Sequence, residues 1–205
     1  MFKPLAFAAC VLIAASAHAT DLALPTAAAQ PGYGAWQQFN VSDIDSLTRG
    51  VEWIDFRNTN GAGFGSALVF TFTIGAGEVG TLAVVDGAFA GDIFAVTNFG
   101  TSIGSTSAVP ATDYASAADF GYDFDAALAN AAFSRAVLSF GAGSYRIGGS
   151  LVQSVLFDGL PLNATVGAVR LTVAPVVAAV PEPSTWAALL GGLILFGVMS
   201  RRRDR

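Results

Sequence analysis

Short runs of alternating apolar and polar residues, separated by glycine, constrain the fold of this chain more than any other feature. Residues 68–74 show the pattern most clearly, because every second position is large and apolar: Leu68, Phe70, Phe72 and Ile74. Successive side chains of a β-strand point to opposite faces, so the pattern predicts a strand with one buried face. Further strands are expected at residues 51–56, 81–85, 93–98, 101–106, 135–140, 145–157 and 164–173. Strands at this spacing predict an all-β fold, an antiparallel β-sandwich or jelly-roll-like domain.

Glycine-containing segments between these runs predict turns at residues 75–77, 98–100 and 141–143. Only residues 125–132 have a helical pattern, with Asp125 as the expected N-cap before a run rich in alanine. We therefore expect little helix in the body of the protein.

The first nineteen residues have the three parts of a secretory signal peptide. Lys3 supplies the positive charge, residues 5–15 are apolar, and residues 17–19 read Ala-His-Ala, the small-x-small pattern that signal peptidase requires. We therefore expect removal of residues 1–19 by signal peptidase, which leaves Thr20 as the first residue of the mature protein. An uncleaved anchor is the alternative, but the apolar run is short for a membrane span.

This cleavage removes three chemically important side chains, Lys3, Cys10 and His18, each the only one of its type. The mature protein then has no cysteine for disulfides, no Cys or His ligand for zinc or copper, and no His or Lys base for a catalytic serine. Residues 75–80 match G-x-G-x-x-G and residues 100–104 match G-x-S-x-G, but both lie among expected strands and lack the strand–turn–helix setting. We expect a protein without a cofactor that is not an enzyme.

The body is acidic. Between Thr20 and Val180, thirteen acidic residues face five arginines and no lysine, a net charge of −8. Nucleic acids and anionic polysaccharides are bound through Lys/Arg clusters, so this balance argues against both. Our first hypothesis is an exported protein with a structural or binding role.

A second hypothesis is an exported glycan-binding or glycan-active protein that uses only Asp and Glu. Glycoside hydrolysis needs two carboxyl groups, and thirteen acids make some pair inevitable. Aromatic rings stack on sugars where they are exposed, although at strand spacing we expect most of these in the core: Tyr33, Trp36, Trp53, Tyr114, Tyr122 and Tyr145.

One loop concentrates carboxylates and is a weak calcium candidate. Asp119, Asp123 and Asp125 lie close together in sequence, and calcium prefers oxygen ligands. No EF-hand spacing is present, so the alternative is a set of solvated loop acids with a helix cap.

The C-terminal region contains, in this order, a proline-containing segment that disfavours helix, an apolar segment long enough to span a membrane, and a cluster of arginines that stops its transfer. Residues 174–183 form an expected linker that ends in Pro-Glu-Pro, residues 184–200 are apolar enough for a single transmembrane helix, and residues 201–205 are a basic cytoplasmic tail. Residues 20–173 then form the exported ectodomain. Prolines lack amide donors and disfavour helix in the preceding residues, so the Pro-Glu-Pro segment is expected to be extended.

This tail resembles the PEP-CTERM sorting signal of Gram-negative bacteria, which is also labelled an ice-binding protein C-terminal domain. The sorting motif is carried by Val180, Pro181, Glu182 and Pro183, and the stop by Arg201, Arg202 and Arg203. The resemblance implies processing by exosortase, a membrane transpeptidase, from an inner-membrane precursor. It also implies delivery to the cell surface or extracellular matrix, with exopolysaccharide as a further partner.

A second resemblance lies in the body. Residues 84–94, 98–104, 133–136 and 141–145 are similar to a β-rich ectodomain found in many PEP-CTERM proteins. This likeness implies the β-rich fold and no activity.

Overall fold

The computed structural model describes residues 19–30, 32–57 and 63–176. The chain divides into two units, Met1–Ala174 and Pro175–Arg205. The predicted transmembrane helix at residues 184–200 lies outside the described residues, as do residues 1–18 of the predicted signal peptide. Within the described part, no helix is both long enough and apolar enough to cross a bilayer.

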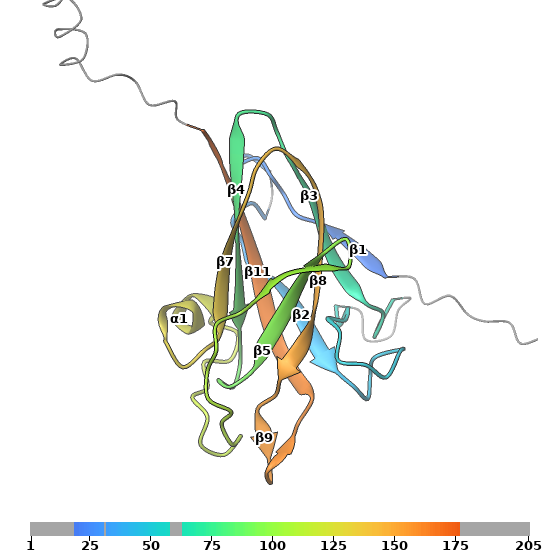
Figure 1. Ribbon diagram of the computed structural model, residues 1–205, viewed down its shortest axis with the longest axis vertical. Coiled ribbons are helices and arrows are strands. Elements are labelled where there is room, and N and C mark those ends of the chain that lie inside the picture. Colours follow the sequence, from blue (N-terminus) through green and yellow to red (C-terminus); the bar gives the residue numbers. More distant parts are fainter. Residues whose placement is uncertain (1–18, 31, 58–62, 177–205) are drawn as a thin grey trace, which may run out of the picture. The chain divides into compact units, whose positions relative to one another are not determined.

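One sheet of the first unit has five strands in the order β1-β3-β8-β5-β6 (Figure 1). Their bounds are β1 Thr20–Ala23, β3 Leu68–Ile74, β5 Ile93–Asn98, β6 Thr101–Ser105 and β8 Gly143–Gln153. Strand β1 pairs with β3 in parallel, and the remaining pairs are antiparallel.

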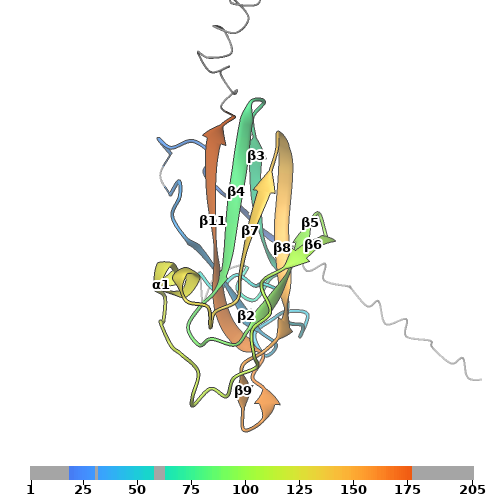
Figure 2. The same ribbon diagram turned by 60° about the vertical axis from the view of Figure 1, so that its left-hand side comes forward.

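The other sheet has four strands in the order β2-β11-β4-β7. Their bounds are β2 Gln37–Ser42, β4 Glu78–Asp86, β7 Arg135–Phe140 and β11 Ala164–Pro175. A small hairpin, β9 Leu156–Phe157 with β10 Leu160–Pro161, precedes β11, and one helix, α1 Phe124–Ala129, precedes β7. The two sheets face each other as a β-sandwich, which confirms the predicted all-β class (Figure 2).

Several strands begin and end where the alternation predicts. Strands β3, β5 and β7 match the predicted ranges residue for residue. The expected strand at residues 51–56 is wrong, because this segment makes only isolated bridges through Glu52 and Ile54. The N-cap of the helix is Asp123, which accepts from the Ala126 amide, and not Asp125.

Large aromatic side chains fill the space between the sheets. Phe70, Phe72 and Ile74 are buried on one face of β3, as the alternation predicts. At the centre, Trp53 stacks on Phe39 with ring centroids 4.0 Å apart.

Two glycines make room for this stacked pair. A Cβ at Gly149 would overlap the ring of Trp53, and one at Gly167 would overlap the ring of Phe39. Both glycines lie in strands, where glycine normally weakens the sheet, and here the close approach of a ring requires it.

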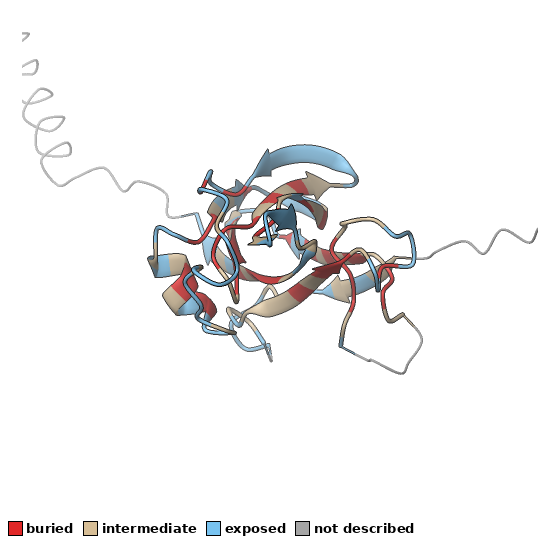
Figure 3. Ribbon diagram, turned by 90° about the horizontal axis from the view of Figure 1, so that it is seen from below, coloured by how far each residue is buried: buried red, intermediate tan, exposed pale blue. Residues whose placement is uncertain are grey.

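The two ends of the sandwich differ. Tight turns between β3 and β4 and between β7 and β8 cross from one sheet to the other and close one end (Figure 1). The opposite end carries the long connections, which we call the loop end and define as residues 43–51, 87–92, 106–123 and 154–163. Seen from this end, the connections range from exposed to buried, and residues 87–92 include no exposed position (Figure 3).

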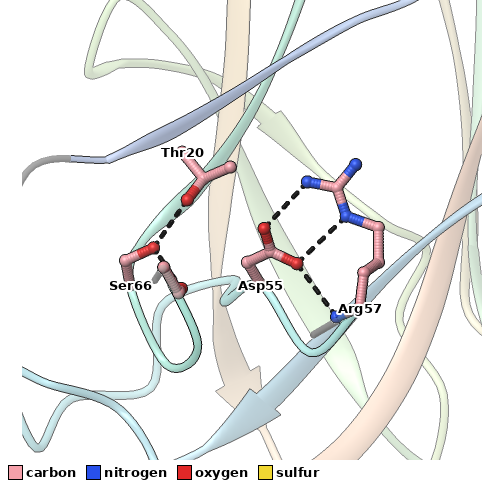
Figure 4. Close-up of polar contacts among 5 residues, drawn as sticks. Thr20, Asp55, Arg57 and Ser66 are labelled. Carbon is pink, nitrogen blue, oxygen red and sulfur yellow. Dashed lines mark hydrogen bonds and ion pairs between the residues drawn. The ribbon is translucent and has the colours of Figure 1, made fainter. Parts of the chain in front are cut away.

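Short polar contacts hold the segments that lead into β3 (Figure 4). The hydroxyls of Thr20 and Ser66 lie 2.7 Å apart, which fixes the start of β1 beside the start of β3. The guanidinium of Arg57 donates two hydrogen bonds to the carboxylate of Asp55, at 3.0 and 2.8 Å. This hydrogen-bonded pairing holds the pKa of Asp55 below its usual value.

Candidate binding site at the loop end

A depression of about 310 Å³ opens between the connections of the loop end. It lies beside the beginning of β11 and the end of β2. Its lining comes from segments far apart in sequence: Asn40, Val41, Ser42, Asp45, Phe56, Ala88, Phe89, Tyr114, Tyr122, Val155, Leu162, Ala164, Thr165 and Val166.

Aromatic rings form one side of this depression. The ring of Phe89 contacts that of Tyr114, with centroids 4.2 Å apart. Tyr114 is 39% exposed and Tyr122 is 70% exposed, so both keep much of their ring surface open to solvent. Tyr114 is fixed by its backbone, since its amide donates to the Leu156 carbonyl at 2.7 Å.

Apolar exposure concentrates around the depression. Eight of the thirteen exposed large apolar side chains in the described residues lie at or beside the loop end. They are Ile44, Leu47, Tyr114, Phe120, Tyr122, Val152, Phe157 and Leu160. Of these, Tyr114 and Tyr122 line the depression itself, and exposed apolar side chains gathered in this way are typical of an interaction site.

Polar groups complete the lining. Ser42 donates from its hydroxyl to Oδ2 of Asp45 at 2.7 Å, and the amide of Asp45 donates back to the Ser42 hydroxyl. Asn40 accepts at Oδ1 from the side chain of Gln38, which directs its amide. Among the described residues of the lining, Asp45 is the only charged side chain, and no arginine is present.

Two fully buried carboxyl groups lie behind the depression. Oδ2 of Asp86 accepts hydrogen bonds from the amides of Gly91 and Asp92, each at 3.3 Å. Asp92 accepts from the Val155 amide at 2.7 Å and from the Thr165 hydroxyl at 2.5 Å. Oδ1 of Asp86 has no donor among the described residues.

The burial of this pair changes its protonation. Burial, together with the charge of Asp92, raises the pKa of Asp86 to about 9. Burial also raises the pKa of Asp92 to about 6, although the bonds from Thr165 and Val155 lower it. Like charges held close together cannot both ionise, so at neutral pH Asp86 keeps its proton and Asp92 carries the charge. With its proton, the Asp86 carboxyl group becomes a donor toward Asp92, and this interaction lowers the pKa of Asp92.

The buried pair positions the floor of the depression. Val155 and Thr165 line it, and both donate to Asp92. The amides that bond to Asp86 belong to the connection between β4 and β5, which also carries Phe89. The depression therefore depends on two carboxyl groups that a ligand does not reach.

The weak calcium candidate is not assembled. The described part of the chain has no group of three or more Asp, Glu, His or Cys side chains arranged to hold a metal ion. Asp119 accepts from the Gly121 amide, Asp123 caps the helix, and Asp125 pairs with Arg170 at 2.6 Å. The hydrogen bond from Arg170 holds the pKa of Asp125 below its usual value.

The two glycine-rich patterns lie in sheet structure. Residues 75–80 form the turn between β3 and β4 and the first residues of β4, and residues 100–104 form the turn before β6 and most of that strand. Neither leads into a helix, so neither provides the helix N-terminus or nucleophile elbow that its chemistry needs.

The predicted sorting and stop residues, 180–183 and 201–203, lie outside the described residues. In sequence, residues 179–203 match the family model described as the PEP-CTERM protein-sorting motif. This chain carries a PEP-CTERM sorting signal. The resemblance noted in the sequence is thereby confirmed.

The PEP-CTERM signal implies exosortase-type sorting of an exported protein with a membrane-anchored precursor. No curated protein matches the chain. Among solved structures, the pre-peptidase C-terminal domain of a collagenase from Bacillus anthracis is similar at 8% identity over 75% of this chain and 94% of that chain, with a TM-score of 0.34. That score is too low to support an argument about this protein, and the fold assignment rests on the sheets themselves.

Sequence reasoning missed the site for a physical reason. Asp86 directly follows the strand predicted at residues 81–85, and Asp92 directly precedes the strand predicted at residues 93–98, which are positions where solvated acids are common. Nothing local marks them as buried. The convergence of Phe89, Tyr114 and Thr165 depends on the packing of connections that are distant in sequence.

Proposed function

We propose that this protein is a non-catalytic binding module of the cell surface or extracellular matrix, delivered there by exosortase-type processing, with the loop end as its binding end. The observation that carries the proposal is the PEP-CTERM sorting signal on a sandwich whose exposed aromatic and apolar side chains gather at one end.

The path of β11 supports this use of the loop end. The strand begins at Ala164, which lines the depression, and runs along the sandwich toward Ala174. At about 3.3 Å per residue, the ten steps between them span about 33 Å. The depression is therefore distant from the point where the chain leaves the sandwich for the sorting signal.

The placement of the acids supports a role without catalysis. The two carboxyl groups with raised pKa, Asp86 and Asp92, are fully buried, and the depression itself contains only Asp45. A glycosidase needs an acid and a base that both reach the substrate. Asp45 lacks a second carboxyl group in the lining, so the glycan-active alternative has no favourable geometry there.

Processing in the producing cells tests the proposal. We expect the protein recovered from the surface or matrix fraction to begin at Thr20 and to end within residues 180–185, as measured by intact mass. Replacement of Pro181 and Pro183 by alanine should retain the chain in the membrane fraction, whereas the matched variant Pro175→Ala outside the motif should be processed normally. Full-length chain ending at Arg205 in the matrix fraction contradicts the proposal.

A further inference from the structure

The lining of the loop-end depression narrows the chemistry of its ligand. Its described residues offer aromatic surface at Tyr114 and Tyr122, oxygen and amide groups at Asn40 and Asp45, and no cationic side chain. An anionic ligand has no partner there, and the net charge of −8 between Thr20 and Val180 repels polyanions at a distance. Phosphate, uronate and sulfate groups do not fit these charges.

An uncharged sugar ring fits the same lining. A pyranose presents an apolar face of C–H groups, which packs on an aromatic ring, and a rim of hydroxyl groups, which both donate and accept. Oδ2 of Asp45 is used by Ser42, while no hydrogen bond within the described residues occupies its Oδ1. A volume of about 310 Å³ lies near the lower limit for small-molecule sites, which suits one or two rings.

Tyrosine is suited to such a surface. Tyr and Trp combine a large apolar ring with a polar group and lose little conformational freedom on binding, because only two torsions become fixed. The ring of Tyr114 is already held against Phe89, and its amide is bonded to Leu156. The platform is therefore ordered before a ligand arrives, which lowers the entropic cost of binding.

We propose that the loop-end depression binds an uncharged hexose ring of a glycan, with Tyr114 and Tyr122 as the stacking surface and Asn40 and Asp45 as hydrogen-bonding groups. This inference rests on the proposed binding role and names its ligand class. The buried Asp86–Asp92 pair takes no part in contact and acts as a positioning element through Val155 and Thr165.

Titration with defined oligosaccharides tests the inference. The probes are cellohexaose, laminarihexaose and maltohexaose, all uncharged, with an oligogalacturonate of the same length as the anionic comparison. The full-length chain is used in a detergent without a sugar headgroup, so the result does not depend on processing. We expect at least one neutral probe to bind, with saturation transfer from aromatic protons to sugar protons, and the anionic probe to bind more weakly or not at all.

Matched variants locate the site. Tyr122→Ala should weaken binding about three- to tenfold, as expected for the loss of one stacked ring, and Tyr122→Phe should retain binding. Because Tyr122 is 70% exposed, thermal unfolding of both variants should match the parent. Phe99→Ala is the control, since Phe99 is 62% exposed in the turn between β5 and β6, away from the depression.

Any of the following binding results overturns the inference: no binding of any neutral probe, binding that Tyr114→Ala and Tyr122→Ala both leave unchanged, or binding lost in Phe99→Ala. Capture of a protein partner through the same tyrosines without any sugar binding also overturns it. These outcomes are distinct from a failure of the proposed delivery, which the intact mass of the matrix-fraction protein reports separately.

Discussion

Replacement of Asp86 by asparagine should stabilise this protein at neutral pH. The folded protein keeps a proton on Asp86, whose pKa is raised to about 9 by burial and by the charge of Asp92. The unfolded chain releases that proton at the ordinary value of 3.8. Folding at pH 7 therefore requires the uptake of one proton. An asparagine is neutral in both the folded and the unfolded state. Its side-chain oxygen accepts hydrogen bonds from the amides of Gly91 and Asp92, and its side-chain nitrogen donates a hydrogen bond to the carboxylate of Asp92.

The magnitude follows from the pKa difference. Each unit of pH above the unfolded pKa costs the folded state about 1.4 kcal/mol until the folded pKa is reached. Over the range from the unfolded pKa of 3.8 to pH 7, this cost adds up to about 4 kcal/mol, which is the largest stabilisation that Asp86→Asn can give. Imperfect hydrogen-bond geometry of the new amide lowers the gain. We expect Asp86→Asn to raise the free energy of unfolding by about 2 to 4 kcal/mol at pH 7 and by much less near pH 4.

The sign of the pH dependence follows from the raised pKa. The stability associated with the Asp86 proton is fully present below the unfolded pKa and is lost as pH rises through the folded pKa of about 9. The stability associated with the Asp92 proton depends on pH in the same direction. Its folded pKa is about 6, so most of that stability is already lost below pH values of about 6.5. Between about pH 6.5 and 8.5 the parent should lose stability steadily, and Asp86→Asn should lose much less.

Urea unfolding across this window is the assay. The predicted mature chain has no histidine or lysine side chain, so few other groups titrate there. Asp158→Asn is the control, because Asp158 is exposed in a connection with a φ of 51° that asparagine also tolerates. It should change the stability by less than about 0.5 kcal/mol and leave the slope unchanged. A parent that is equally stable at pH 6.5 and 8.5, or an Asp86→Asn variant less stable than the parent at pH 7, refutes the reasoning.

Three further predictions concern the sheets. Phe72→Ala should lower the free energy of unfolding by about 3 to 5 kcal/mol, because the ring is buried against Phe140; a change near zero in urea unfolding contradicts the packing. Gly149→Ala should cost about 1 to 3 kcal/mol, because its methyl group would overlap Trp53, and a neutral result by the same assay means that the ring can move. Ser102→Ala should change the stability by no more than about 0.5 kcal/mol, because Ser102 is exposed on β6, and fluorophosphonate labelling lost in this variant alone would contradict a non-catalytic role.

The sequence predicted the sheets well where burial alternates within one strand. Residues 68–74 and 93–98 have large apolar side chains at every second position or nearly so, and their strands match the prediction in full. Strand β1 was not predicted, since Thr20–Ala23 is short and its parallel pairing with β3 depends on a distant partner. Strand β2 was also missed, because Gln37–Ser42 combines two glutamines with an asparagine and shows weak alternation.

The candidate site could be predicted only in part. Tyr114 and Tyr122 were among the aromatics considered for sugar stacking, and they are exposed, whereas Trp53 from the same set is fully buried. Local sequence does not separate these cases, because exposure depends on which connection covers which ring. The buried pair Asp86 and Asp92 was beyond sequence reasoning, since an acid at a strand end is solvated in most proteins.

The predicted absence of cysteine from the mature chain makes this polar pair important for the loop end. Long connections lose much conformational entropy when they become ordered, and exported proteins often offset that loss with disulfides. Here the amides of Gly91, Asp92 and Val155 are held by two buried carboxyl groups, and the side chain of Gln153 donates to the carbonyls of Gly91 and Val109. Such a network is strong only while every member is satisfied. Because Asp86 keeps its proton only below a pKa of about 9, the order of the binding depression is coupled to pH through a buried residue behind it.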